Sequence, residues 1–190
     1  MKIKNVLVVD NYDSFTYNLV YIVRKLGFKP VIWRNDQFQL EDVNDFDKII
    51  LSPGPGIPSE AGLMPSLISK FGPEKSILGV CLGHQAIGES FGGNLINLKE
   101  VYHGVSTEVE LSEKEIIFSG LPSRIQVGRY HSWVVDENTF PEDLAITAKD
   151  FNGQVMALRH KKYDLAGIQF HPESIMTAYG TEMISNWLAG

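Results

Sequence analysis

Short apolar runs separated by glycine, proline and polar residues dominate the first half of the chain. Four of them, at 6–9, 31–33, 49–51 and 77–80, have the length of buried strands. They lack polar alternation, which is typical of strands covered on both faces of a parallel sheet. Between the first two, apolar residues recur at offsets of 0, 4, 7, 8 and 11 from Phe15, as on one helical face. We expect Ser14 to cap this helix and Gly27 to end it.

A short helical turn at 40–46 and a helix at about 82–91, stopped by the glycines at 92–93, complete the first half of the chain. The second half predicts a different arrangement. Shorter candidate strands then follow at 106–111, 145–149, 155–160 and 165–169, and a final helix at about 181–188. Strands that alternate with helices predict a single α/β domain, with an open, mostly parallel sheet, helices on both faces and a smaller antiparallel section.

Composition narrows the class of protein without identifying it. The 190 residues are 44% hydrophobic and 21% charged, as in a soluble globular domain. The net charge is −6 and the basic residues are scattered, which argues against nucleic-acid binding. No apolar run approaches the roughly 18 residues of a membrane helix, and MKIKNVLVVD is interpreted as a strand rather than a signal peptide. A single cysteine cannot form an internal disulfide, so we expect a cytoplasmic protein.

Cys81 lies in the segment G-V-C-L-G, between a predicted strand and a predicted helix. This is the cysteine counterpart of the G-x-S-x-G elbow, in which the nucleophile occupies a sharp turn. Flanking glycines avoid clashes where strand and helix approach, and a helix N-terminus favours a thiolate. A lone cysteine is more often a small buried hydrophobe. Both glycines, the strand before Cys81 and the helix after it favour a nucleophile here.

His171 and Glu173 follow the last apolar strand in G-I-Q-F-H-P-E. Residues two apart in an extended segment point to the same side, and Pro172 restrains the segment between them. The carboxylate can then orient the imidazole, which activates the cysteine and later protonates the leaving amine. Alone, either residue would be interpreted as structural or surface-exposed; together with Cys81 they predict a catalytic triad.

Acyl transfer also requires an oxyanion hole, usually of two backbone N–H donors. One donor is expected from Leu82, the residue after the nucleophile, and the other from the stiff glycine-proline loop S-P-G-P-G-I-P through Gly56. Phosphate binding by this loop is not supported. The chain lacks G-x-x-x-x-G-K-[ST], and Ser59 stands where the third glycine of G-x-G-x-x-G is required.

Over essentially its whole length the chain resembles the class I (triad) glutamine amidotransferases. The segments SPGPGIP, GVCLGHQAIG and GIQFHPES match that family's three signatures in order. DNYDSFTYN at 10–18 and RYHS at 129–132 are similar to the small subunits of anthranilate synthase and aminodeoxychorismate synthase. The resemblance implies a flavodoxin-like fold and one type 1 glutamine amidotransferase domain over residues 1–190.

The resemblance also implies a function. The chain is expected to be the glutaminase subunit of anthranilate synthase, releasing glutamate and ammonia from L-glutamine through a Cys81 thioester. A large chorismate-binding subunit would receive the ammonia, since this chain has no room for a second active site. The small subunit of aminodeoxychorismate synthase, or a subunit serving both pathways, is the alternative. No metal or organic cofactor is expected.

Glutamine contacts follow from the same resemblance. The expected set is Gly54, Pro55, Gly56, Gln85, Ser132 and Trp133. Gln85 lies four residues after Cys81, on the same helical face, where its amide can bind the α-amino or α-carboxyl group of the substrate. Two positions depart from the family pattern. Val105 stands where lysine is frequent and Trp133 where leucine is frequent; Trp133 is expected to offer glutamine only its backbone.

Three other functions compete with this prediction. Cys81 and His84 have C-x-x-H spacing, but no second ligand pair accompanies them, so a zinc hydrolase is disfavoured and His84 is expected to pack under the elbow. A cysteine peptidase or γ-glutamyl hydrolase shares the elbow, yet the N-terminal block and Gln85 favour free glutamine. A non-catalytic regulatory subunit is disfavoured by the intact Cys81, His171 and Glu173.

Overall fold

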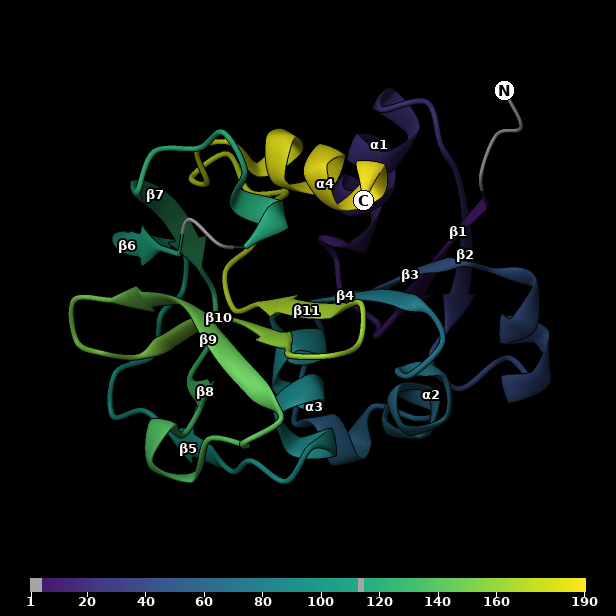
Figure 1. The fold of residues 1–190 in the computed structure, drawn as a ribbon, viewed down its shortest axis with the longest axis horizontal. Helices are drawn as coiled ribbons and strands as arrows, with labels where there is room; N and C mark the ends of the chain where they lie inside the picture. Colours follow the sequence, from purple (N-terminus) through teal and green to yellow (C-terminus); the bar gives the residue numbers. More distant parts are fainter. Residues whose placement is uncertain (1–4, 113–114) are drawn as a thin grey trace.

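A nine-stranded sheet runs through the computed structural model of the chain, which describes residues 5–112 and 115–190 (Figure 1). Its strand order is β2-β1-β3-β4-β11-β10-β9-β6-β7. The first five strands are parallel: β2 (Lys29–Arg34), β1 (Asn5–Asp10), β3 (Lys48–Leu51), β4 (Ser76–Val80) and β11 (Leu165–Ile168). The other four are antiparallel: β10 (Val155–His160), β9 (Leu144–Asp150), β6 (Val105–Leu111) and β7 (Arg124–Arg129). The parallel part has the flavodoxin-like order 2-1-3-4-5.

Helices cover both faces of the parallel strands (Figure 1). Helices α1 (Thr16–Lys25) and α4 (Gly180–Ala189) lie on one face, and α2 (Met64–Phe71) and α3 (Leu82–Ser90) on the other. Alternate residues of β1 serve the two layers: Val6 and Val8 pack toward α1 and α4, while Leu7 and Val9 pack toward α2 and α3. The α/β prediction, with helices on both faces, is therefore confirmed.

Most predicted elements are present, with one wrong detail. The four early strands, the helix after Phe15, the turn at 40–46 (η1, Leu40–Asp45) and the final helix all form. The predicted Ser14 cap is wrong: the Asp13 carboxylate accepts a hydrogen bond from the Phe15 N–H at 2.7 Å, and the Asp13 carbonyl accepts one from Thr16. Gly27 ends α1 in the left-handed region, with φ of 85°, as expected.

Several elements were not predicted. Helix α2 begins at the dipeptide Met-Pro, which suggests a loop, but proline is tolerated in the first helical turn. Strand β7, the two-stranded sheet of β5 (Leu95–Asn97) and β8 (Trp133–Val135), and the short 3₁₀ turns η2 (Pro58–Glu60), η3 (Ile116–Phe118) and η4 (Glu137–Thr139) were also missed. Across the described ranges, no helix combines the length and the apolar character that crossing a bilayer requires.

The carboxyl ends of four adjacent parallel strands bring distant segments together. Strands β1, β3, β4 and β11 are neighbours in the sheet and end at the same edge. The residues that follow them are Asn11, Ser52, Cys81 and Gln169. All four are buried, so a polar cluster forms at the edge where open α/β sheets bind ligands.

Candidate active site

Cys81 occupies a strained turn between β4 and α3. Its backbone has φ of 51° and ψ of −98°, a conformation that non-glycine residues rarely adopt. The turn is fixed on both sides: the Cys81 N–H donates to the Ile168 carbonyl, and its carbonyl accepts from the Gln85 N–H at 3.0 Å. A Cβ built on Gly79 would lie 2.5 Å from the Gly83 carbonyl oxygen, so the flanking glycines permit the close approach predicted from the sequence.

His171 and Glu173 form a buried pair beyond β11. The His171 Nδ1 lies 2.7 Å from the Glu173 Oε1, and both side chains are almost completely shielded from solvent. The Nε2 of His171, facing away from the carboxylate, has no hydrogen-bond partner among the described residues. Burial alone lowers the pKa of His171, but the negative charge on the Cys81 sulfur and the Glu173 carboxylate outweigh burial and hold that pKa well above its ordinary value. The imidazole is thus set up to carry a proton.

Two aromatic rings hold the imidazole in place, and both come from segments distant in sequence. Phe15 contacts the His171 ring edge-on, with centroids 5.7 Å apart, and Tyr130 does so at 4.9 Å. The Tyr130 hydroxyl also lies 3.2 Å from the Ser174 hydroxyl. The blocks at 10–18 and 129–132 therefore meet at the histidine. Neither ring was predicted as a site residue, because nothing in their local sequence indicates which side chain they contact.

A cavity of about 190 Å³ lies beside Cys81 and gathers the predicted glutamine contacts. Its lining includes Gly54, Pro55, Gly56, Cys81, Gln85, Ser132 and Trp133. The Gln85 Nε2 donates to the Trp133 carbonyl at 2.8 Å and to the Gln169 Oε1 at 3.2 Å. Both amide hydrogens of Gln85 are thus used within the chain. Its oxygen is left to accept a hydrogen bond, which an α-amino group can donate and an α-carboxylate cannot.

The two predicted oxyanion-hole residues, Leu82 and Gly56, lie in different positions relative to the nucleophile. Leu82 is the first residue of α3, so its N–H has no acceptor within the helix. Its side chain turns away from the small cavity and packs against Gly54. Gly56 lines the small cavity and has φ of 76°, which favours glycine. A Cβ at Gly56 would lie 2.5 Å from the Glu60 carboxylate oxygen.

The loop that carries Gly54 and Gly56 is held by the segment after β1. The Asn11 N–H donates to the Ser52 hydroxyl at 2.9 Å, and the Asn11 Nδ2 donates to the Ser52 carbonyl at 2.8 Å. The Asn11 oxygen accepts from the Asn35 Nδ2 at 3.0 Å. A Cβ on Gly54 would lie 2.6 Å from the Asn11 Cβ. Asn11, which was not predicted as a site residue, therefore sets the position of this loop.

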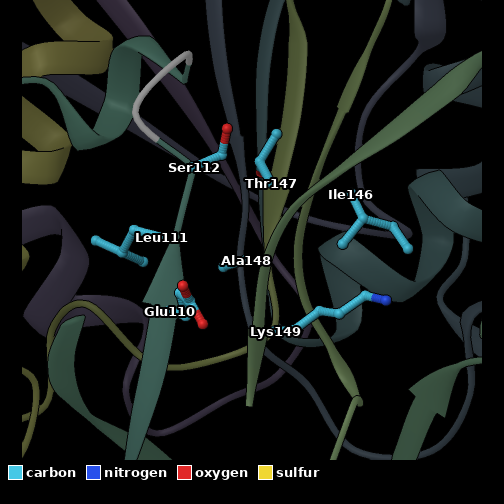
Figure 2. Close-up of a pocket in the computed structure, with 7 residues that line it drawn as sticks. All are labelled: Glu110, Leu111, Ser112, Ile146, Thr147, Ala148 and Lys149. Carbon is cyan, nitrogen blue, oxygen red and sulfur yellow. The ribbon is translucent and has the colours of Figure 1, made fainter. Parts of the chain in front are cut away.

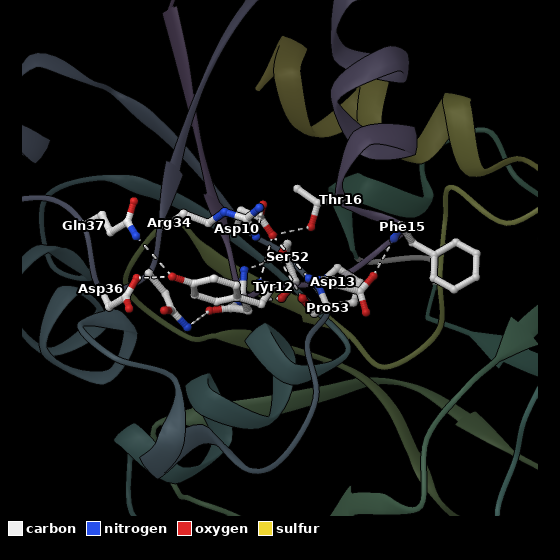
Figure 3. A network of polar contacts seen from close by, with 12 residues as sticks. Asp10, Tyr12, Asp13, Phe15, Thr16, Arg34, Asp36, Gln37, Ser52 and Pro53 are labelled. Atoms are coloured by element: carbon white, nitrogen blue, oxygen red, sulfur yellow. Dashed lines mark hydrogen bonds and ion pairs between the residues drawn. The ribbon is translucent and has the colours of Figure 1, made fainter.

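Asp10 organises the rest of that segment (Figure 3). Its carboxylate accepts hydrogen bonds from the Tyr12 N–H at 2.9 Å and the Thr16 hydroxyl at 2.9 Å, and it forms an ion pair with Arg34 at 3.0 Å. The Arg34 guanidinium stacks over the Tyr12 ring, and the Tyr12 hydroxyl donates to Asp36. Tyr12 consequently adopts a left-handed φ of 62°. Tyr12 also lines a second cavity, of about 530 Å³, that borders Cys81 and His171.

A further cavity, of about 450 Å³, lies away from this site between β6 and β9 (Figure 2). It is lined by Glu110, Leu111, Ser112, Ile146, Thr147, Ala148 and Lys149. None of the predicted catalytic or glutamine-binding residues borders it. It is therefore separate from the candidate active site.

The other histidines do not join Cys81 in a ligand set. Across residues 5–112 and 115–190, no group of three or more His, Cys, Asp or Glu side chains is arranged to hold a metal ion. His84 is fully buried on α3 and lies against Gly167 of β11, as expected for a residue packing under the elbow. Burial lowers its pKa to about 4, so it is neutral near pH 7.

Comparisons with known proteins agree with this geometry. The family model for glutamine amidotransferase class-I matches residues 7–190. The chain is 46% identical to anthranilate synthase component 2 of Thermus thermophilus, covering 98% of this chain and 93% of that protein. It is 42% identical to aminodeoxychorismate/anthranilate synthase component 2 of Bacillus subtilis, covering 96% and 95%. The crystal structure of a Thermoplasma acidophilum protein described as part of GMP synthase superposes with a TM-score of 0.90 at 30% identity, covering 100% and 94%.

Proposed function

The chain belongs to the class-I glutamine amidotransferase family, and from this we propose that it is the glutamine-hydrolysing subunit of an anthranilate synthase. It is an enzyme that takes ammonia from the side-chain amide of L-glutamine. The observation that carries the proposal is the meeting of Cys81 with the His171–Glu173 pair beside a cavity lined by the expected glutamine contacts.

We propose that Cys81, His171 and Glu173 act as nucleophile, acid–base and orienting carboxylate. The Cys81 thiol gives its proton to the His171 Nε2, and the thiolate attacks the amide carbon of glutamine. The proton then passes from His171 to the departing ammonia, leaving a γ-glutamyl thioester on the sulfur. His171 next takes a proton from water, which hydrolyses the thioester to glutamate. The 2.7 Å contact with Glu173 supports this role because it fixes the ring and favours its charged form.

The oxyanion of both tetrahedral intermediates is proposed to lie between the N–H of Leu82 and the loop at Gly56. The start of α3 supports Leu82, since the first N–H groups of a helix have no internal acceptor. Removing one such donor costs about 3 kcal/mol of transition-state stabilisation. Every step uses side chains or backbone groups of this chain, so the proposed reaction requires no metal or organic cofactor.

The proposed partner is a large subunit that aminates chorismate. The relative from Thermus thermophilus is named as component 2 of anthranilate synthase, and a second component is implied by that name. The Bacillus subtilis relative carries the names of both aminodeoxychorismate and anthranilate synthases. A protein shared with 4-aminobenzoate synthesis is therefore the second candidate function.

Measuring glutamate release from glutamine tests the proposal. The purified chain is assayed alone, with chorismate plus the large subunit of an anthranilate synthase, and with chorismate plus the large subunit of an aminodeoxychorismate synthase. We expect release that rises with the first partner, tracks anthranilate formation and disappears in Cys81→Ala. If glutamate release rises only with the large subunit of aminodeoxychorismate synthase, the chain is assigned to the alternative pathway. If no glutamate is released with either large subunit, the proposal is refuted.

A further inference from the structure

Gln169 contacts the sulfur of Cys81, a contact that the triad does not include. It follows β11 directly, lies two residues before His171 and is completely buried. Its Nε2 lies 3.5 Å from the Cys81 Sγ, within hydrogen-bonding distance for sulfur. Its backbone N–H donates to the Met156 carbonyl at 2.8 Å, which fixes the residue to β10.

The orientation of the Gln169 amide is set by a chain of neighbours. The Trp133 carbonyl can only accept, so the Gln85 end that lies 2.8 Å from it must be the Nε2. The same Nε2 must then face the oxygen of Gln169, at 3.2 Å. This leaves the Gln169 Nε2 toward the sulfur. The alternative orientation would place two amide NH₂ groups against each other in a buried site.

A buried arginine fixes the orientation of His131, the second side chain that donates to the Trp133 carbonyl. Arg129 is fully buried, is paired with Asp150 at 2.7 Å, and donates its Nε–H to the His131 Nε2 at 3.1 Å. Since that nitrogen accepts, the Nδ1 of His131 carries the hydrogen and donates to the Trp133 carbonyl at 2.9 Å. Burial and the Arg129 charge lower the pKa of His131 to about 3, so this arrangement persists at neutral pH. Each hydrogen bond in the series from Arg129 to Cys81 therefore has an assigned donor and an assigned acceptor, and the assignments are mutually consistent.

We propose that Gln169 is a fourth residue of the catalytic centre, which donates a hydrogen bond to the Cys81 sulfur and stabilises the thiolate before attack. The inference rests on the proposed function and adds a group to its machinery. The Gln169 amide lies within hydrogen-bonding distance of the sulfur, beside the His171 imidazole, which interacts with the same sulfur. The bond weakens when the sulfur becomes a neutral thioester, so Gln169 acts on the nucleophile rather than on the oxyanion.

Alkylation of Cys81 by iodoacetamide measures this role without glutamine or a partner. The chain has one cysteine, so the rate reports only on Cys81. Gln169→Met keeps the length of the side chain and removes the donor, whereas Gln169→Glu places a carboxylate beside the sulfur. We expect the pH at half-maximal alkylation to rise in both variants, and the rate at pH 7 to fall about ten-fold in Gln169→Met.

Other titratable groups border the two cavities that Cys81 shares. They are Tyr12, Asp13, Tyr102, His103, Tyr130, His131 and His171. All are retained in the variants, so a difference between the pH profiles reports the Gln169 amide. Gln126→Met, at an exposed glutamine on β7, is the matched control and should keep the wild-type profile.

The outcomes separate this inference from the proposed function. A Gln169→Met or Gln169→Glu chain with native circular dichroism and an unchanged alkylation profile would overturn the inference, even if glutamate release with the large subunit succeeds. A raised profile in Gln169→Met, which adds no charge, supports the inference even if that assay fails. If Gln169→Met does not fold, Gln169→Leu takes its place, because it also removes the donor without adding a charge beside the thiolate.

Discussion

At the scale of single residues, the candidate active site depends on a pair of oppositely charged side chains that are both buried. The His171–Glu173 pair lies in a region where an isolated charge would be strongly disfavoured, and the two groups compensate each other. Thr177 donates its hydroxyl to the His171 carbonyl, and the His171 N–H donates to the Gly128 carbonyl, so the backbone of the histidine is fixed as well as its ring. The triad residues thus have little freedom to adopt unproductive geometries.

Replacing Glu173 with glutamine tests the orienting role. The change removes the charge that helps to raise the pKa of His171, so the imidazolium is lost at a lower pH and the leaving ammonia is protonated less well. We expect partner-stimulated glutamate release to fall at least about ten-fold at neutral pH. The alkaline limb of its pH profile should also move toward lower pH. Glu182→Gln, an exposed site on α4, is the control; an unchanged limb in Glu173→Gln would contradict the role.

Asn11 allows a second test at this scale. Its side chain is buried and joins Ser52, Asn35 and the sulfur of Met64. Asn11→Ala leaves these groups without a partner, and we expect the free energy of unfolding to fall by about 1–3 kcal/mol. Because the loop at 54–56 loses its support, kcat for glutamate release should decrease further than stability alone explains. Asn44→Ala, in an exposed turn, is a suitable control, and an equal effect in both variants would refute the positioning role.

At the scale of elements, the unit β4–turn–α3 explains the glycine spacing around Cys81. A Cβ on Gly83 would lie 2.5 Å from the Leu51 carbonyl oxygen, so α3 contacts β3 as closely as β4. The two glycines let the helix begin at once after the strand, and Cys81 is left at its N-terminus. The carbonyl of Trp133, at the start of β8, accepts hydrogen bonds from both Gln85 and His131. The bond from Gln85, which lies on α3, connects the small sheet to this unit.

Gly79→Ala measures the tightness of this unit. The added methyl group meets backbone that cannot move without displacing α3, so we expect a loss of about 3 kcal/mol or more in the free energy of unfolding, measured by urea titration. At Gly92, where nothing lies within 4 Å and φ is 94°, Gly92→Asn should cost less than about 1 kcal/mol because asparagine tolerates left-handed backbone. Comparable losses at the two positions would mean that the elbow is not tightly packed.

At the scale of the whole molecule, the fold places two buried neutral histidines next to the site. Burial lowers the pKa of His84 to about 4, and burial with the Arg129 charge lowers that of His131 to about 3. Both values lie below the unfolded value of about 6.5. At these two positions the unfolded chain therefore binds more protons between about pH 6.5 and 4, so the two histidines make stability fall as the pH falls through that range. His171, with a raised pKa, is protonated in both states there and does not oppose the trend.

The slope of stability against pH tests whether these histidines are held neutral in the folded chain. Each such histidine contributes about 1.4 kcal/mol per pH unit to the free energy of unfolding between its two pKa values. His84→Met should reduce the slope by about that amount between pH 6 and 4.5, and leave the slope above pH 7 equal to that of the wild type. Equal slopes in the acidic range would show that His84 is not held neutral.

Local sequence alone determined much of this protein. The strand and helix periods predicted the parallel α/β core, and the G-V-C-L-G spacing identified the elbow, because both depend on residues within a few positions of each other. The contact between His171 and Glu173 is present as expected, but the extended segment from which it was predicted is wrong. Residues 171–174 form a turn in which the Ser174 N–H donates to the His171 carbonyl at 3.2 Å. Ser14 failed as a cap because Asp13 competes for the same N–H groups, and α2 was hidden by its proline.

Only the tertiary structure decided which distant segments share the site. That Phe15 and Tyr130 contact the His171 ring, that Asn11 supports the Gly54–Gly56 loop, and that Gln169 donates to the Cys81 sulfur all depend on strand order. The parallel order β1-β3-β4-β11 brings together carboxyl ends that are far apart along the chain, such as those at Cys81 and Gln169, which are separated by 88 positions. Hydrophobic burial sets that order through the whole core, and no local pattern encodes it.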